Sequence, residues 1–553
     1  MNNTFPGFIR HPAPYVYEYL TEEPAPLFRR HFTVREGLNR AVLTVCALGL
    51  GDLYINGRPM TRDRFLSPYS NYNKTLWYTE HDVTLLMKPG ENVAAAALGN
   101  GFYNESLHTA WDFNDADWRD VPKLMLRLIL SYADGTTDII DSDEDWLCDR
   151  DCSPYRFNQL RCGETYDSRY AMDWMKPDFD DSGWVHAIPA EKPAGEFRKN
   201  PAPPIREFET YNCIGLRHNE NDSYTFDFGQ NMSGYIRLRA NQPAGTKLRI
   251  TYAEQIEADG SRRDNGFAGG HFYRDCWTQS CELICKDGET VWTPCFSYFG
   301  FRYVIIEGYV TPPAATDAQA IFVHQAVTPR SEFSCSDDTL NKLFAFSRMS
   351  TYSNLFNMPT DCPTREKLGW ANDAQASCEQ MVQNYDMSGF YEKWLQDIID
   401  AVNDAGDLPG IIPTHGWGYR WGNGPVSTGI LYEIPYRIWQ YTGDTAPFVK
   451  ALPAMVKHLD FLMDKRDGNS GLIATGLNDW AMPPRPGTNP NTPLDYCAHL
   501  LVIKMTRYAA LAADFAKDAA LAENLRAREA KLTDEFKAVY VNADGTVGVD
   551  TQC

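Results

Sequence analysis

The side chains of this chain that are best suited to chemistry gather in residues 361–375, DCPTREKLGWANDAQ. They are three carboxylates, an arginine and an indole: Asp361, Arg365, Glu366, Trp370 and Asp373. Carboxylates can act as general acid, as general base or as acceptors of sugar hydroxyl groups. An arginine can hold one carboxylate charged while another keeps its proton, and an indole offers an apolar face to the C–H side of a sugar ring. This combination favours a carbohydrate site.

The local sequence indicates how these side chains are presented. Pro363 and Gly369 interrupt regular structure, so the stretch should begin as a loop. From residue 372 the sequence NDAQASCEQMVQNY predicts a helix, with Asn372 or Asp373 as its N-cap. A loop of this composition at a helix start is more often a solvated cap with a salt bridge than an active site. The spacing alone leaves both interpretations open.

The same run closely resembles the signature of one enzyme family, the inverting α-L-rhamnosidases of glycoside hydrolase family 78. The matching elements are Asp-Cys-Pro-x-Arg-Glu, then Leu-Gly-Trp, then Asp-Ala-Gln. The resemblance implies that the segment opens the active site of an (α/α)6 barrel. It also implies a glycoside hydrolase that releases terminal α-L-rhamnose, or a closely similar sugar, from glycosides or oligosaccharides by an inverting acid/base mechanism.

The resemblance also implies roles for individual residues. Glu366 would be the general acid that protonates the glycosidic oxygen. The implied substrate-binding residues are Asp361, Arg365, Trp370, Asp373, Trp421, Asp479 and Trp480. Because a general acid must keep its proton near neutral pH, we expect its pKa to be raised relative to that of Asp361. Inversion needs a second carboxylate about 6.5–9.5 Å away; none is assigned here, and Glu433 is the nearest internal candidate.

Length and composition bound the remaining possibilities. The 553 residues are too many for one domain. The net charge of −21 argues against nucleic acid and anionic membranes as partners, and no apolar stretch of about 18 residues predicts a membrane span. The fourteen cysteines lack metal-binding spacing, and residues 1–12 do not resemble a signal peptide. We therefore expect reduced thiols, no metal ligand set and a cytoplasmic protein. A homodimer is left open.

The sequence predicts a multidomain β + α protein: two N-terminal β-sandwich (jelly-roll-like) domains followed by an incomplete (α/α)6 barrel. Residues 1–35 are expected to form an irregular extension, 36–204 a carbohydrate-binding-like sandwich, and 205–329 a second sandwich. Apolar residues alternate with period two up to about residue 328, with turn signals such as Asn56-Gly57.

Two motifs of the first sandwich resemble recurring motifs of the family's N-terminal domain, GETYDSR at 163–169 and DFDDSGW at 178–184. In parts of the family this domain binds rhamnose together with a calcium ion. Aspartates on loops can ligate calcium, yet an acidic turn that closes a strand onto Trp184 accounts for the second motif equally well. Calcium is therefore the one cofactor left open, with no ligand residue assigned.

The hydrophobic period changes to 3.6 after Pro329, which predicts a helical catalytic domain over residues 330–553. A helix capped within residues 336–340 should come first. The other helices are expected at 373–384, 388–404, 427–443, 445–464, 493–517 and 519–538. A complete barrel has twelve helices, so we expect a C-terminally truncated domain. The family resemblance implies that its general base lies beyond residue 553, and we therefore expect that this chain does not turn over by itself.

Two long connections between these helices are expected to carry site residues, because long loops inside a helical barrel are usually functional. Residues 409–425 contain Trp421 and His415, and the histidine is expected to pack or to form a hydrogen bond. Residues 466–493 contain Asn478-Asp479-Trp480, where the family usually has Gly-Asp-Trp. Ser427-Thr428 stands where family members commonly carry Trp-Asp, so one sugar contact is missing or replaced and the sugar specificity stays open.

Two alternatives remain. The chain could be a carbohydrate-binding protein without turnover, which the first sandwich and the altered residues 427–428 would allow. It could also be another (α/α)6 carbohydrate-active enzyme, such as a lyase or a phosphorylase, although DCPTREKLGW is not the signature of those enzymes. The expected partner in the first interpretation is a rhamnosylated glycoside or oligosaccharide.

Overall fold

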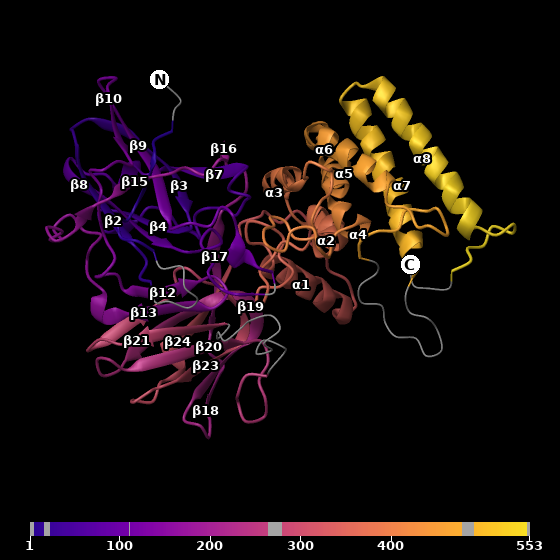
Figure 1. Ribbon diagram of the computed structural model, residues 1–553. Coiled ribbons are helices and arrows are strands. Elements are labelled where there is room, and N and C mark those ends of the chain that lie inside the picture. Colours follow the sequence, from indigo (N-terminus) through magenta and orange to yellow (C-terminus); the bar gives the residue numbers. More distant parts are fainter. Residues whose placement is uncertain (1–4, 16–22, 110, 264–278, 478–491, 550–553) are drawn as a thin grey trace.

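A computed structural model describes residues 5–15, 23–109, 111–263, 279–477 and 492–549. The chain builds three β-sheets followed by a set of α-helices (Figure 1). The first two sheets and the third lie one above the other in Figure 1, and the helices extend to one side of them.

The first two sheets face each other as a β-sandwich. One has the order β15-β1-β9-β3-β7-β16, with β10 beside β9; its strands are Ile188–Ala190, Phe8–Arg10, Lys123–Tyr132, Leu38–Leu48, Thr75–Asp82, Glu196–Lys199 and Thr137–Asp141. The other has the order β14-β11-β2-β8-β4-β5; its strands are Val185–His186, Leu147–Asp149, Leu27–Val34, Gly90–Gly99, Leu50–Ile55 and Arg58–Pro59.

Strand β8 explains why part of this sandwich reads as a continuous apolar run. Ala94, Ala96 and Leu98 point into the core between the two sheets, whereas Val93 and Ala95 belong to a second core that continues into the other units. Successive side chains of a strand point to opposite faces, so a strand buried on both faces loses the alternation of apolar and polar residues.

The third sheet has eleven strands and bends along its longest strand. Its path is β12-β13-β21-β20-β23-β19-β24-β17-β6, with β18 and β22 beside β19. The strands are Tyr155–Gln159, Gly163–Asp167, Ser280–Ile284, Lys247–Ala253, Phe299–Glu307, Tyr224–Asn241, Ala318–Gln325, Ile205–Asn212, Asp63–Arg64, Gly215–His218 and Glu289–Trp292. The pairing of β19 with β23 shifts register between Asp227 and Met232, and such irregularities let a sheet curl.

Sheet membership differs from the expected boundaries at two places. Strands β1 and β2 precede residue 36 and pair inside the first sandwich, so the first 35 residues are not simply an extension. Strands β12 and β13 precede residue 205 but join the third sheet through a parallel pairing of β13 with β21. Short strands with few apolar positions carry too weak a periodicity to show which sheet they join.

The helices follow as predicted by the change of period. They are α1 Asp338–Ser353, α2 Ala371–Asn384, α3 Ser388–Ala401, α4 Pro425–Thr428, α5 Ile430–Thr442, α6 Ala446–Met463, α7 Leu494–Phe515 and α8 Ala519–Tyr540. Asp337 caps α1 by accepting hydrogen bonds from the backbone N–H groups of Thr339 and Leu340. The expected helix 427–443 is divided at Gly429 into α4 and α5.

Helix α2 starts earlier than expected, and the predicted N-cap is wrong. Its N-cap is Trp370, which makes no side-chain cap hydrogen bond. The N–H group of Ala371 instead donates to the carbonyl oxygen of Gly410, 2.8 Å away. A carbonyl group from a distant loop therefore satisfies a helix-terminal N–H group that usually takes a side-chain cap.

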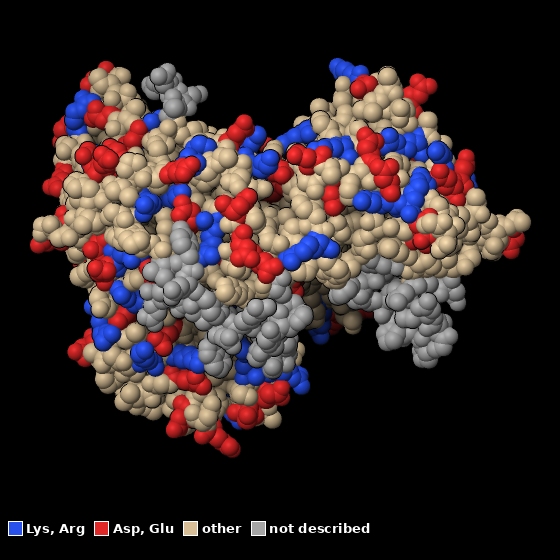
Figure 2. Space-filling model, in the orientation of Figure 1, with Lys and Arg blue, Asp and Glu red and all other residues tan. Residues whose placement is uncertain are grey.

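The surface carries acidic and basic side chains intermixed on the face shown in Figure 2, over both the β part and the helices. None of the helices in the described residues is both long enough and apolar enough to cross a membrane.

A fully buried ion pair ties α3 to the first sandwich. The ammonium group of Lys393 donates to Asp397, 2.6 Å away, and to the carbonyl oxygen of Tyr69 at 2.5 Å. The indole N–H group of Trp77, on β7, donates to the same aspartate at 3.3 Å. The charges of this pair are shielded from water on both sides, so each depends on the other.

We expect Lys393→Met to destabilise the protein by about 3–5 kcal/mol, because it leaves the Asp397 carboxylate buried without its cation. The double variant Lys393→Met/Asp397→Leu should lose much less, since no charge stays unpaired. Chemical denaturation measures both. Lys176→Met is the control: its pair with Asp173 is exposed and should contribute little to stability. Equal losses for Lys393→Met and Lys176→Met would contradict the prediction.

Candidate active site

The loop at 361–370 is held in place by its own backbone and by the start of the 409–425 connection. The N–H group of Asp361 donates to the carbonyl oxygen of Leu368 at 3.0 Å, and the Leu368 N–H group donates to the Asp361 carboxylate at 3.0 Å. The N–H group of Ile412 donates to Gly369 at 2.9 Å. A Cβ atom at residue 369 would lie 2.1 Å from the Ile412 carbonyl oxygen, so only glycine permits this approach.

The carboxylate of Glu366 is held by two neighbours of the same loop. The guanidinium group of Arg365 donates to one oxygen at 2.8 Å, and the indole N–H group of Trp370 donates to the other at 2.7 Å. The Glu366 side chain is 14% exposed. Charge-assisted hydrogen bonds at these distances are strong and directional, so the carboxylate has a defined orientation at the edge of the surface.

Asp361 is the carboxyl group of this loop with a strongly raised pKa. Burial first, and then the negative charge of Glu366, raise the pKa of Asp361 to about 7. The pKa of Asp373, in the first turn of α2, is also raised, by loss of surrounding water and by the charge of Glu366. The sequence led us to expect the raised pKa on Glu366, the predicted general acid. The structure gives it to Asp361 instead.

Trp370 is not an open platform for a sugar ring. Its side chain is 8% exposed, and its ring packs edge-on against Trp417 and Trp421, with centroid distances of 6.1 and 5.8 Å. A Cβ atom at Gly422 would lie 2.4 Å from the Trp370 ring. Trp421, by contrast, is 42% exposed. The accessible indole face of the cluster therefore belongs to Trp421, and Trp370 serves to hold Glu366.

The two long connections lie against each other, as the prediction of a shared site requires. The N–H group of Leu477 donates to the carbonyl oxygen of Asn423 at 2.9 Å. Gly424 and Gly476 approach so closely that a Cβ atom on either would collide with the other. The predicted Asp479 and Trp480 lie outside the described residues, directly after this contact.

Ser427 and Thr428 lie in the interior and cannot contact a sugar in this arrangement. Both side chains are fully buried. The Ser427 hydroxyl donates to the carbonyl oxygen of Gly422 at 2.6 Å, and the Thr428 hydroxyl lies 2.8 Å from His458. Both therefore stabilise the connection around α4. The sugar contact that a Trp-Asp pair would offer here is absent from these two positions.

His415 joins the 409–425 connection to the first sandwich. Its Nε2 atom accepts a hydrogen bond from the Asp117 N–H group at 2.9 Å, and its ring packs edge-on against Trp118 at 4.8 Å. Burial lowers its pKa. These contacts agree with the packing and hydrogen-bonding role expected from the sequence.

Glu433 has the surroundings of a structural residue. Its carboxylate accepts from Arg437 at 2.7 Å and pairs with Lys504 of α7 at 2.8 Å. Arg437 also pairs with Glu379 of α2 at 2.7 Å. The two cations hold this carboxylate in a network that joins three helices, which leaves it poorly suited to activate a water molecule.

In the DFDDSGW turn of the first sandwich, the carboxylate of Asp181 is paired with side chains of the same domain. Asp181 accepts a hydrogen bond from the buried Arg29 at 2.9 Å and lies 3.0 Å from His31. The guanidinium group of Arg29 also lies over the rings of Phe179 and Trp184. Within the described part of the chain, no group of three or more potential metal-ligating side chains was found. The cations at Asp181 do not favour calcium there, and calcium elsewhere stays a prediction.

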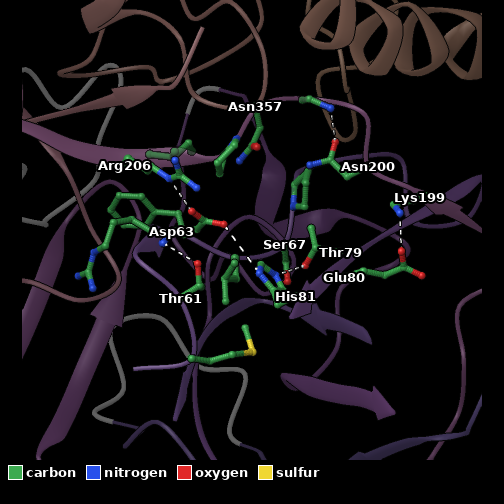
Figure 3. Close-up of a pocket in the computed structure, with 18 of the residues that line it drawn as sticks. Thr61, Asp63, Ser67, Thr79, Glu80, His81, Lys199, Asn200, Arg206 and Asn357 are labelled. Atoms are coloured by element: carbon green, nitrogen blue, oxygen red, sulfur yellow. Dashed lines mark hydrogen bonds and ion pairs between the residues drawn. The ribbon is translucent and has the colours of Figure 1, made fainter. Parts of the chain in front are cut away.

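A hollow between the first sandwich and the third sheet lies apart from these residues (Figure 3). Its volume is about 390 Å³, and residues of β6, β7, β16 and β17 line it together with Asn357. Its charged groups pair with one another: Asp63 accepts from Arg206 at 2.7 Å, and Glu80 pairs with Lys199. None of the predicted site residues that the structure describes lines this hollow.

Two buried residues that the sequence did not single out support the backbone of the site loop. Arg161 donates to the carbonyl oxygen of Glu366 at 2.7 Å, and Lys367 is fully buried beside it. Lys367 lies inside the recognised motif, and only that adjacency could have drawn attention to it. No local sequence pattern points to Arg161, because it lies 205 residues away from Glu366 in the sequence.

We expect the stability of Asp361→Asn relative to the unchanged protein to depend on pH. Asp361 has a pKa of about 7 in the folded chain and 3.8 ordinarily. A raised pKa stabilises the fold at low pH, and this contribution is lost as the pH rises through 7. We therefore compare the melting temperature of the variant with that of the unchanged protein at each pH. The difference, variant minus unchanged protein, should be more positive at pH 8 than at pH 5.

Asp134→Asn is the control for that measurement. Hydrogen bonds from Thr136 lower the pKa of Asp134 below its usual value of 3.8, so its ionisation should not change between pH 5 and pH 8. A difference for Asp361→Asn no larger than that for Asp134→Asn would show that Asp361 is ionised throughout this range.

Comparison with family models matches this chain to three α-L-rhamnosidase domains. The bacterial α-L-rhamnosidase 6 hairpin glycosidase domain matches residues 329–553. The α-L-rhamnosidase N-terminal domain matches residues 36–209, and the bacterial α-L-rhamnosidase concanavalin-like domain matches residues 217–324. The three models follow one another along nearly the whole chain.

Individual relatives agree. A protein of Formosa agariphila named α-L-rhamnosidase is 30% identical over 537 residues, which cover 94% of this chain and 56% of the relative. The structure of α-L-rhamnosidase from Dictyoglumus thermophilum superimposes with a TM-score of 0.88 at 29% identity, covering 97% of this chain and 60% of that one. That of Streptomyces avermitilis α-L-rhamnosidase complexed with L-rhamnose has a TM-score of 0.86 at 28% identity, covering 95% and 50%.

The chain therefore spans about half to three-fifths of the length of these relatives. The order of the matched domains, the fold and the residues around Glu366 point the same way, and the chain belongs to the bacterial α-L-rhamnosidase family of glycoside hydrolases.

Proposed function

We propose that this chain forms a site for the hydrolysis of terminal α-L-rhamnosides, in which Glu366 donates the proton to the departing glycosidic oxygen. The observation that supports the proposal most directly is the geometry of the Glu366 carboxylate. It is fixed by Arg365 and Trp370, and Trp370 in turn packs against the accessible indole of Trp421. The same stretch of sequence carries two further carboxylates, Asp361 and Asp373.

Arg365 is placed to serve both the acid and the sugar. Its guanidinium group pairs with the Glu366 carboxylate, 2.8 Å away. In this proposal Arg365 also donates to sugar hydroxyl groups, because a guanidinium group presents several N–H donors in one plane.

Inversion requires a base on the opposite side of the anomeric carbon. Glu433 is disfavoured by its two ion pairs. Asp361, whose pKa is raised to about 7, and the more accessible Asp373 are assigned to binding hydroxyl groups in this proposal. The base is not assigned here. Because the sequence predicts it beyond residue 553, the rate measurements below use this chain extended to the length of its relatives.

We expect Glu366→Gln to reduce the turnover of rhamnosides with poor leaving groups far more than that of activated aryl rhamnosides, because only poor leaving groups need a proton from the enzyme. Steady-state kinetics on an alkyl and on a nitrophenyl α-L-rhamnoside measures the difference. Equal losses on both substrates would make Glu366 a binding residue. Rhamnose binding without hydrolysis by the unchanged protein would favour a carbohydrate-binding protein.

We expect Trp370→Phe and Trp421→Ala to affect different steps. Trp370→Phe keeps a packed ring but removes the hydrogen bond to Glu366. A hydrogen bond to a charged group contributes about 1.5–3 kcal/mol, so kcat should fall about tenfold to a hundredfold. Trp421→Ala should weaken the binding of L-rhamnose by about 1–3 kcal/mol in a calorimetric titration, the scale of one aromatic contact. The reverse pattern would place the sugar on Trp370 instead.

A further inference from the structure

The side chain of Arg161 reaches the backbone of the candidate acid from the β part of the protein. Arg161 lies in the turn between β12 and β13, and its Nε–H group donates to the carbonyl oxygen of Glu366 at 2.7 Å. Its side chain is fully buried. This contact joins the β part directly to the residue that carries the proposed chemistry.

The guanidinium group of Arg161 has one well-defined position. It pairs with the carboxylate of Glu105, which is also fully buried, and it lies over the rings of Phe113 and Trp111, 5.4 and 5.9 Å from their centroids. A buried cation is tolerated only where it is paired and hydrogen-bonded, so the guanidinium group cannot leave this place without large cost. The hydrogen bond to Glu366 is therefore made by a fixed donor.

The next residue, Lys367, is also anchored in the protein interior. It has φ of +53°, a conformation that a non-glycine residue keeps only when its surroundings impose it. Its ammonium group lies 5.1 and 5.5 Å from the ring centroids of Tyr298 and Phe299. Burial first, and the charge of Arg161 second, lower its pKa to about 7. Residues 366 and 367 are thus both held by buried side-chain contacts.

The segment that supports Arg161 also holds the second site loop. The carbonyl oxygen of Trp111 accepts from the Trp417 N–H group at 3.0 Å, and Asp112 pairs with Arg420 at 2.7 Å. Residues 111–118 of the first sandwich therefore contact both the support of Glu366 and the loop that carries Trp421.

We propose that Arg161, held by Glu105, is a positioning residue that fixes the Glu366 backbone, and hence its carboxylate, relative to the loop of Trp421. Its role in turnover rests on the proposed function; its role in ordering the loop does not. Arg161 would touch neither sugar nor leaving group. Because reacting groups must lie within a narrow range of geometry, a small displacement of a catalytic group can cost about a hundredfold in rate.

Arg161→Lys tests the proposal without leaving Glu105 unpaired. The ammonium group keeps the positive charge, but it lacks the planar fork that lets a guanidinium group serve a carboxylate and a carbonyl group at once. We expect kcat for an alkyl α-L-rhamnoside to fall about 10- to 100-fold, with a smaller loss for a nitrophenyl rhamnoside and little change in KM. Amide hydrogen exchange of peptides covering residues 361–370 should become faster.

A second variant guards against misfolding. Arg161→Met/Glu105→Gln removes both charges and should fold, since no buried charge stays unpaired; it should show the same leaving-group pattern and the same faster exchange. Arg127→Lys is the matched control. Arg127 pairs with Asp141 at 2.7 Å between β9 and β10, and its substitution should leave every readout unchanged.

The measurements distinguish failure of the positioning role from failure of the proposed function. A lower melting temperature with unchanged kcat on both substrates and unchanged exchange at 361–370 would overturn the proposal and make Arg161 a structural ion-pair residue only. If the unchanged protein hydrolyses no rhamnoside, the proposed function fails, and the exchange measurement alone decides: faster exchange in both Arg161 variants supports positioning of the loop, and exchange equal to that of Arg127→Lys overturns it.

Discussion

Buried ion pairs connect the β part of this structure to its helices and to the site loop. A buried ion is tolerated only where it is paired and hydrogen-bonded, so the groups that contact each pair are fixed relative to one another. Lys393 and Asp397 hold α3 beneath the strand that carries Trp77. Arg161 and Glu105 support the backbone of the site loop. The β part therefore contributes directly to the site loop, because Arg161 donates a hydrogen bond to the backbone of Glu366.

Loops without regular hydrogen bonding need such external support to hold catalytic groups still. The 361–370 loop receives hydrogen bonds from two remote segments, through Ile412 and through Arg161. Glycine at residue 369 allows the backbone of one loop to approach another within a distance that any side chain would prevent. The carboxylate of Glu366 is then oriented by its immediate neighbours, Arg365 and Trp370. Remote contacts set the backbone, and local contacts set the side chain.

The parts of the structure that could be predicted from the sequence are those with local causes. The change from period two to period 3.6 placed the β and helical parts, and Asp337 caps α1 as its residue type suggests. The proximity of Glu366, Arg365 and Trp370 could be predicted from the motif, because these residues lie within one loop. The burial of Trp370 could not be predicted, since it depends on the approach of Gly422. The start of α2 depends on a carbonyl group of the 409–425 connection, and Arg161 depends on the whole fold.

The two neighbouring carboxyl groups of the site loop differ in a way that follows from their partners. Glu366 has a cation at 2.8 Å and an indole donor at 2.7 Å, whereas Asp361 has one backbone donor and lies in the field of Glu366. Two strong donors give a carboxylate a defined orientation, whereas burial beside a second carboxylate raises the pKa of a carboxyl group. Hydrogen bonding therefore distinguishes Glu366, and burial distinguishes Asp361.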